Sequence, residues 1–376
     1  MIKEYTSLGL MSGTSGDGVD ASIIRSDGNT KYEVIKDKYF KYDNEIYLNI
    51  HTLKEKINKL EDLQKFSKEL DDLERKITLF HAKTIENLCD NNKIDIIGFH
   101  GQTIYHNAQE KISNQLGNGK LLSQLTKKNI VHNFRQQDIK NGGEGAPLTP
   151  IFHQLIIEQK KIKPPVIIIN LGGVANYTLI WQGREIPLQN NLLSADTGPG
   201  NCLIDEWIRK KTTMSYDKKG KIASQGNINK EIIRKLLKAH PFKKSYDIKD
   251  FNLTLLNKLS LEDGAATLTE YTAISLIDSI LDFLEDAQWY KTMNILLCGG
   301  GRKNNFLVSR IKKKIVNSKT NRLAKLIDCL SIDGDFVESQ AFSYLAIRSY
   351  LGLPISFPNT TGCKKPTIGG VLVKNY

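Results

Sequence analysis

Residues 9–20 read GLMSGTSGDGVD, a glycine-rich stretch between two strand-like runs, YTSLGLM and VDASIIRS. Glycine permits a positive φ and lets a ligand touch the backbone, and successive N–H groups in a tight turn form an anion site. Thr14 and Ser15 add hydroxyl donors, and Asp17 offers the oxygen ligand that a hydrated magnesium ion prefers. The stretch predicts a phosphate-binding turn. The alternative is a plain β-hairpin whose turn is made by Asp17 and Gly18.

Two further glycine clusters follow strand-like runs. VIIINLGGVANYTLIW, at residues 166–181, repeats the order of strand, glycine turn and strand after the linker-like KKIKPP, which suggests an internal duplication. LLCGGGRKNNFL, at residues 296–307, lies between a strand and a helix, where N–H groups can face a nucleotide, although an ordinary loop is the alternative. The GxxxxGK[ST] motif is absent, and no GxGxxG opens a helix after a strand. Two hairpins that grip a polyphosphate are therefore favoured.

A carboxylate with catalytic potential lies in SADTGPGNCLIDEW. Asp196 ends a short apolar run, and Gly198, Pro199 and Gly200 follow it ahead of a helix. A carboxylate held there can accept a proton from an attacking hydroxyl or water. The alternative is that Asp196 caps the helix. Because it lies rather far ahead of the helical pattern, catalysis is favoured.

Polar residues also follow two other strand-like runs. GFHGQTIYH contains His100, Gln102 and Thr103, and NFRQQDIKNGGEGAPL contains Arg135 and Asp138 before a glycine loop. Alternating donors and acceptors suit a polyhydroxylated ligand with a carboxylate, which Arg135 would bind while Asp138 binds hydroxyls. The alternative is a surface ion pair between Arg135 and Asp138.

Near the end of the chain, SIDGDFVESQAFSYLAIRSYLGLP predicts a helix that begins at Asp335. Glu338 falls in its first turn, where a carboxylate also interacts favourably with the helix dipole. A ligand-facing role is favoured over this purely local one.

The elements that must position these residues mix strands and helices. Strand-like runs are YTSLGLM, VDASIIRS, YEVIKDKYF, IDIIGFH, NIVHNF, PVIIINL, VANYTLIW and MNILLCG. Helical periodicity covers residues 44–89, 147–159, 201–211, 228–239, 264–287, 303–316 and 336–351. The fold class is α/β, and 376 residues are enough for two domains.

Composition narrows the classes of partner. The net charge of +12 is spread over scattered lysines without interleaved aromatic residues, which argues against nucleic acid and suits a polyanionic small ligand. No run approaches about 18 apolar residues, so no membrane association is expected. The five cysteines are widely spaced and form no CxxC, as is typical of reduced thiols in the cytoplasm.

Together these stretches resemble the anhydro-N-acetylmuramic acid kinases of bacterial peptidoglycan recycling. The similarity runs nearly end to end. GLMSGTSGDGVDA, GFHGQT, NFRQQDIKNGGEGAPLTP, INLGGVANYT, DTGPGN, ATLTEYTA, LLCGGGRKN and DGDFVESQAFSYLA occur in the family's order.

The resemblance implies two ribonuclease-H-like domains of the sugar kinase, actin and heat-shock chaperone type, with ATP and Mg²⁺ held in a cleft between them. The implied domains are residues 1–133 with 352–376, and residues 134–351. It also implies hydrolysis of a 1,6-anhydro bond coupled to phosphoryl transfer from ATP, in a cytoplasmic homodimer. The products are N-acetylmuramic acid 6-phosphate and ADP.

The resemblance and the residue patterns described above together give the predicted site residues. Asp196 matches the general base that activates water, and Glu338 matches a family carboxylate expected on the sugar side. His100, Gln102, Thr103, Arg135 and Asp138 are the predicted sugar-binding residues, and Asp17 is the predicted magnesium neighbour. The predicted nucleotide-binding residues are Gly13, Thr14, Ser15, Gly16, Asp17, Gly18, Val19, Asp20, Gly172, Gly173, Asn176, Gly198, Gly200, Gly299, Gly300 and Asn304.

The sequence departs from the family pattern in places. Gly16 stands where a larger apolar residue is usual, Lys140, Asn141 and Glu144 replace small or amide residues, and HPFKKSYDIKDF matches only loosely. These departures bear on substrate fit. Three other hypotheses remain: an ATP-dependent switch of the actin or chaperone type, a kinase of another sugar, and an inactive sugar sensor, which should lack Asp196 or the hairpin aspartates.

Overall fold

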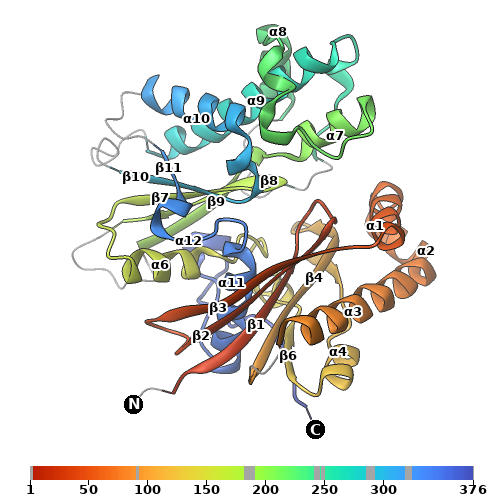
Figure 1. The fold of residues 1–376 in the computed structure, drawn as a ribbon, viewed down its shortest axis with the longest axis vertical. Coiled ribbons are helices and arrows are strands. Elements are labelled where there is room, and N and C mark those ends of the chain that lie inside the picture. Colours follow the sequence, from red (N-terminus) through yellow and green to blue (C-terminus); the bar gives the residue numbers. More distant parts are fainter. Residues whose placement is uncertain are drawn as a thin grey trace. The chain divides into compact units, whose positions relative to one another are not determined.

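The computed structural model of the protein describes residues 3–89, 93–181, 191–240, 246, 250–284, 293–317 and 324–375. The chain divides into two compact units, Met1–Lys161 with Phe336–Tyr376, and Ile162–Asp335 (Figure 1). Residues 134–161 and 336–351 thus group with the first unit, whereas the sequence placed them in the second domain. The grouping follows from packing, because the helix after Phe336 lies on the first unit's sheet.

The first unit combines a mixed sheet with helices. Its strands are β1 (Tyr5–Ser12), β2 (Gly18–Ser26), β3 (Tyr32–Lys41), β4 (Ile96–Asn107), β5 (Ile112–Leu116), β6 (Asn129–His132) and β12 (Val371–Val373). Its helices are α1 (Asn44–Lys56), α2 (Leu60–Lys65), α3 (Ser67–Cys89), α4 (Gly119–Thr126), α5 (Gln136–Lys140), α6 (Pro150–Gln159), α11 (Val337–Tyr350) and α12 (Pro358–Thr361). The sheet order is β12-β6-β4-β1-β2-β3, and β5 pairs with β4.

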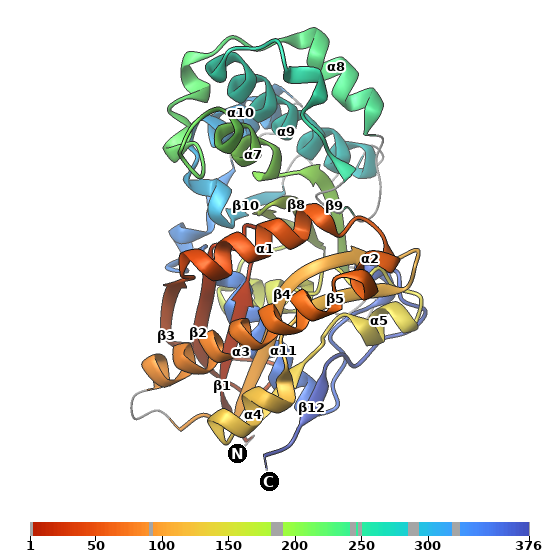
Figure 2. The same cartoon turned by 90° about the vertical axis from the view of Figure 1, so that its right-hand side faces the viewer.

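Alternation along β1 sends successive side chains to opposite faces of this sheet. Leu8 and Leu10 pack with Ile50 of α1 and Ile77 of α3 in one core, and Figure 2 shows α1 and α3 in front of the strands with α11 behind them. Gly9 faces the other way, since a Cβ there would overlap backbone atoms of α11. Helix α11 can therefore approach the sheet closely.

The second unit has a smaller sheet. Its strands are β7 (Val166–Leu171), β8 (Val174–Ile180), β9 (Leu192–Pro199), β10 (Asn294–Cys298) and β11 (Lys325–Leu326), in the order β11-β10-β7-β8-β9. Its helices are α7 (Cys202–Lys211), α8 (Lys230–Ala239), α9 (Leu261–Leu284) and α10 (Asn305–Asn317), with a short 3-10 turn, η7, at Gly300–Lys303. Ile169 and Tyr177 of the sheet share a core with Ile277 of α9 and Ile311 of α10.

The two sheets share one topology. In each, the first three strands form an antiparallel meander, β1-β2-β3 and β7-β8-β9. The next strand returns parallel to the first, as β4 beside β1 and β10 beside β7, and β6 and β11 extend each sheet in parallel. The predicted equivalence of the two hairpins and the α/β fold with two ribonuclease-H-like domains are confirmed.

No helix in the described part of the chain has the length and apolar character needed to cross a membrane.

Candidate active site

The first glycine turn, residues 13–17, joins β1 to β2. Gly16 adopts a φ of +62°, and its N–H donates to the Gly13 carbonyl at 3.1 Å. Gly18 is already the first residue of β2, so the alternative of a hairpin turned by Asp17 and Gly18 is wrong. The usual larger residue at position 16 would be strained, because φ is positive and Ile50 Cγ2 would lie 2.9 Å from its Cβ.

The tip of this turn faces solvent while its base is buried. Thr14, Ser15 and Asp17 are exposed, and the Ser15 hydroxyl donates to Asp17 Oδ1 at 2.5 Å. Among the described residues, the N–H groups of Thr14 and Ser15 have no protein acceptor. The turn therefore presents backbone donors at an exposed tip, as an anion site requires.

Side chains from two neighbouring elements hold the turn by its carbonyl groups. Gln102 of β4 donates to the Gly13 carbonyl at 3.1 Å and accepts from the Ser12 hydroxyl at 2.7 Å. From α1, Lys54 donates to the Thr14 carbonyl at 2.8 Å, and His51 Nε2 lies 3.0 Å from the Ser15 carbonyl. These contacts are all made to carbonyl oxygens of the turn. They hold the turn in place and leave the N–H groups at its tip available to a ligand.

Packing alone is enough to require glycine at position 18. A Cβ on Gly18 would overlap the Phe40 carbonyl oxygen of β3 and lie 2.6 Å from the Tyr39 ring. Val19 and Asp20 continue β2 and pair with Phe40 and Tyr39. A substitution at Gly18 would therefore disturb the sheet whether or not phosphate binds nearby.

The second glycine turn, Gly172 and Gly173, joins β7 to β8 and is bound to the end of β9. Gly200 and Cys202 donate their N–H groups to the Gly173 carbonyl at 2.9 and 3.1 Å, and Asn201 donates to the Gly172 carbonyl at 2.8 Å. A Cβ on Gly200 would overlap the Gly172 carbonyl oxygen. The DTGPGN segment and the second hairpin therefore form one rigid assembly ahead of α7.

Asp196 lies inside β9, opposite Asn176 of β8. Its side chain is only 5% exposed, and Oδ2 accepts the Tyr246 N–H at 2.9 Å. Asn201 is the residue at the N-cap of α7, so the alternative role of Asp196 as a helix cap is wrong. The carboxylate is therefore buried, and the Tyr246 N–H helps to orient it. Asn176 Oδ1 is buried without a hydrogen-bond partner among the described residues.

A cavity of about 140 Å³ in the second unit lies next to this strand end. Its lining includes Gly198 of β9, Tyr246, and Tyr271 and Asp278 of α9. Burial, together with the nearby Asp282 carboxylate, raises the pKa of Asp278. Phenol, hydroxyl and carboxyl groups of this kind can hydrogen-bond a polyhydroxylated ligand.

The third cluster follows β10. Gly299 has a φ of +78°, and Gly300 is exposed with no atom within 4 Å of a built Cβ. Asn304 accepts the Leu307 N–H at 3.0 Å and so caps α10, a local role that the nucleotide-binding prediction did not include. Arg302 is buried beside three aspartates.

The predicted sugar-binding residues of the first unit have extensive internal contacts. Arg135 Nε donates to His100 Nε2 at 3.1 Å, and the carbonyl of Gly145 accepts from the same guanidinium at 2.8 Å. Burial, with the charge of Arg135, lowers the pKa of His100 to about 3, so the imidazole is neutral and Nδ1–H donates to the Gly101 carbonyl. Thr103 accepts weakly from Gln115 at 3.4 Å.

Asp138 has a structural role that the sequence did not reveal. It is fully buried, and Oδ2 accepts the Gly145 N–H at 2.8 Å. Its Oδ1 accepts the hydroxyls of Ser356 at 2.5 Å and Thr361 at 2.7 Å. Asp138 therefore anchors the glycine loop to the C-terminal segment, and its predicted contact with sugar hydroxyls has no support from this geometry.

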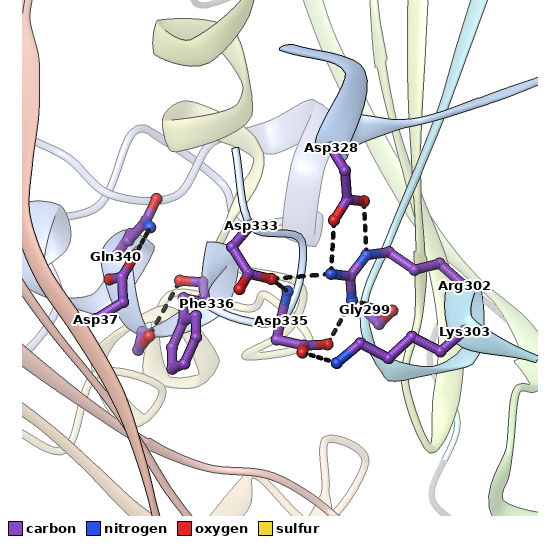
Figure 3. A network of polar contacts seen from close by, with 10 residues as sticks. Asp37, Gly299, Arg302, Lys303, Asp328, Asp333, Asp335, Phe336 and Gln340 are labelled. Atoms are coloured by element: carbon purple, nitrogen blue, oxygen red, sulfur yellow. Dashed lines mark hydrogen bonds and ion pairs between the residues drawn. The ribbon is translucent and has the colours of Figure 1, made fainter. Parts of the chain in front are cut away.

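Glu338 is the second residue of α11 and is partly exposed. Two residues on, Gln340 donates to Asp37 Oδ2 of β3 at 2.9 Å (Figure 3). The start of α11 is thus tied to the sheet of the first unit.

Comparison with known proteins agrees with these features. The family model for anhydro-N-acetylmuramic acid kinase matches residues 5–375. The chain belongs to this family. It is 54% identical to the anhydro-N-acetylmuramic acid kinase of Pelagibacter ubique over 100% of both chains, and 33% identical to that of Agrobacterium fabrum over 98% of both. The activator of 2-hydroxyisocaproyl-CoA dehydratase from Clostridium difficile, solved with bound ADPNP, aligns over 92% of this chain and 96% of its own, with 11% identity and a TM-score of 0.43.

Three residues at these turns were not predicted from the sequence: His51 and Lys54, which contact the first turn, and Arg302, which bonds Gly299 within the third cluster. The spacing of His51 and Lys54 places them on one face of α1, which was an available signal. Residues 241–245 and 247–249, in the segment that matches the family loosely, lie outside the described residues.

Proposed function

We propose that this chain uses ATP to convert 1,6-anhydro-N-acetylmuramic acid into N-acetylmuramic acid 6-phosphate and ADP. Water adds to the anomeric carbon as the bond from that carbon to the 6-oxygen breaks. One hydrogen of the water stays on the new hydroxyl and the other passes to Asp196. The 6-oxygen keeps the electron pair of the broken bond and attacks the γ-phosphorus, and the bond from that phosphorus to ADP breaks.

The observation that carries this proposal is the burial and hydrogen bonding of the Asp196 carboxylate. Its carboxylate is 5% exposed and accepts the Tyr246 N–H, on a strand whose end is hydrogen-bonded to the second glycine turn. Burial removes bulk water that would compete for the base, and the hydrogen bond fixes its orientation. Family membership supplies the substrate, because the relatives are named for it.

The nucleotide is assigned to the glycine clusters. The Thr14 and Ser15 N–H groups at the first tip are proposed to bind phosphate, and the open backbone at Gly300 is proposed to lie along the nucleotide. The exposed Asp17 carboxylate suits a hydrated magnesium ion, a hard cation that prefers oxygen. Such an ion would neutralise charge that develops on the phosphates.

Other parts of the proposal follow from the residue pattern, in the case of Arg135, and otherwise from the resemblance. Arg135 is proposed to meet the substrate carboxylate and Glu338 to act on the sugar side, in a cytoplasmic homodimer. The sugar and ATP are proposed to meet in a cleft that closes on both and so excludes stray water.

The test is the Asp196→Asn variant, assayed for sugar-ring opening and ADP release in the same reaction. Asparagine keeps the size and an oxygen acceptor for the Tyr246 N–H but cannot take the proton. We expect both products to fall together by on the order of a hundred- to ten-thousand-fold, with nucleotide and sugar affinity retained. N-acetylmuramic acid and glucose, offered in place of the anhydro sugar, check the substrate.

A matched control is Asp217→Asn. Asp217 is a similarly buried carboxylate of the same unit, 3% exposed, and it accepts the N–H groups of Ile222 and Ala223. Its variant should keep full turnover per folded molecule. Near-normal turnover of Asp196→Asn would remove the general base from the proposal, and ADP release independent of any sugar would favour a nucleotide switch.

A further inference from the structure

The guanidinium of Arg302, in the third glycine cluster, is bonded through all five of its N–H donors (Figure 3). Nε and Nη2 donate to the two oxygens of Asp328 at 2.8 and 2.9 Å, and Nη2 also donates to Asp333 at 2.9 Å. Nη1 donates to Asp335 and, at 3.2 Å, to the carbonyl of Gly299. The residue is 4% exposed, so these bonds replace its hydration.

The chemistry of the cluster demands arginine. Burial disfavours the cation, but hydrogen bonds to Asp328 and Asp335 outweigh it and raise the pKa of Arg302. The bond from Arg302 in turn lowers the pKa of Asp328. Lysine has three donors at one point and cannot form the two parallel bonds to Asp328 while also reaching the other partners.

Arg302 connects two segments of the chain, the loop that begins at Gly299 and the segment that contains Asp333 and Asp335. Gly299 belongs to the proposed nucleotide loop, and its N–H donates to the Gly334 carbonyl at 3.0 Å. Asp333 and Asp335 are among the last residues of the second unit, since the chain enters the first unit at Phe336. Glu338 follows three residues after Asp335, in the first turn of α11. Arg302 therefore bonds the loop to Asp333–Asp335, the segment that leads from the second unit into α11. We call this segment the crossing.

We propose that Arg302 is a positioning residue that holds the Gly299–Lys303 loop and the Asp333–Asp335 crossing as one element, so that the crossing sets the affinity of the loop for nucleotide. The proposal rests on the proposed function only for the assignment of nucleotide to this loop. Because Arg302 has no spare donor, movement of either segment breaks a charged hydrogen bond. Nucleotide binding and the position of the crossing are thereby linked.

The test compares Arg302→Lys and Asp335→Asn with the wild-type protein, using a fluorescent ATP analogue without sugar to measure nucleotide affinity. Arg302→Lys should weaken nucleotide binding by about tenfold and Asp335→Asn by about threefold, since each loses charged hydrogen bonds. The Michaelis constant for the sugar should change by less than about twofold. Asp335 lies outside the loop and bonds both Arg302 and Lys303 of the loop, so its effect reports the linkage between the loop and the crossing rather than a lost contact of its own with nucleotide.

Arg310→Lys is the matched control. Arg310 of α10 pairs with Glu270 of α9 at 2.5 Å in the same unit, and Glu270 also pairs with Lys314 of α10. If Arg302→Lys and Arg310→Lys lose similar thermal stability, only a loss of nucleotide affinity that is specific to Arg302→Lys supports the inference.

Nucleotide affinities of Arg302→Lys and Asp335→Asn within twofold of wild type would overturn the inference. If Arg302→Lys does not fold, Asp335→Asn decides alone. If the wild-type protein itself binds no ATP analogue, the proposed function fails instead, so the two failures are distinguishable.

Discussion

His81 offers a quantitative test of the first unit's core. It lies on α3 and is fully buried, with its ring centroid 4.8 Å from that of Phe99. Nδ1 lies 2.8 Å from the Ile77 carbonyl, which can only accept, so Nδ1 carries the hydrogen. Among the described residues, Nε2 has no partner. A second proton on Nε2 would therefore bury a cation beside aromatic and aliphatic groups without an acceptor.

The consequence is a loss of stability in acid. Burial lowers the pKa of His81 to about 4, against an ordinary value of 6.5. Between these values the unfolded chain binds a proton that the folded chain does not, so the free energy of unfolding falls as pH falls. From pH 7 to 4.5 the loss from this one residue is about 2 kcal/mol, since each pKa unit corresponds to about 1.4 kcal/mol.

The perturbation is His81→Met, which has a similar volume and does not titrate. Its unfolding free energy at pH 7 should change by about 1 kcal/mol or less, and the loss between pH 7 and 4.5 should be about 2 kcal/mol smaller than in the wild type. Urea unfolding at both pH values measures this. Leu88→Met, at another fully buried position of α3, is the control for packing and should keep the wild-type pH dependence. Equal acid losses in wild type and His81→Met would refute a buried neutral imidazole.

Two glycine substitutions should separate packing from ligand binding. Gly98→Ala should lower the free energy of unfolding by about 1–3 kcal/mol, because the new Cβ would overlap the Phe342 carbonyl oxygen of α11; unchanged urea unfolding would contradict this. Gly300→Ala should leave stability unchanged, because nothing lies within 4 Å of its Cβ, yet raise the Michaelis constant for ATP several-fold. An unchanged constant would remove Gly300 from the nucleotide site.

Much of the architecture was predictable because the spacing of apolar residues along the sequence indicates helices and strands. The two hairpins were predicted from glycine-rich turns between apolar runs, and most of the predicted helices were placed within a few residues of their observed bounds. The predicted helix over residues 44–89 is instead divided into α1, α2 and α3. The break falls at Ile57, which adopts extended backbone and is fully buried. Periodicity alone could not show that this side chain leaves the helix to reach the core.

Strand β9 was missed because glycine and proline near its end made the segment look like a loop. The structural roles of Asp138 and Arg302 could not be predicted for a different reason. The hydroxyl partners of Asp138 are 218 and 223 residues away in sequence, and the aspartates around Arg302 are 26 to 33 residues away without regular spacing. Such pairings depend on tertiary structure and leave no periodic signal.

The predicted nucleotide-binding glycines differ in the physical reason that glycine is needed at each position. Gly16 needs its positive φ, while Gly18 and Gly200 would each bring a Cβ against backbone. These residues are glycine for the fold itself, so their presence says little about a ligand. At Gly13 the nearest neighbour of a built Cβ is 3.8 Å away, and at Gly300 there is none within 4 Å; neither has a positive φ. Neither conformation nor packing requires glycine at these two positions, and close approach by a ligand is the remaining physical reason. Gly13 and Gly300 belong to two of the glycine clusters that are proposed to bind ATP.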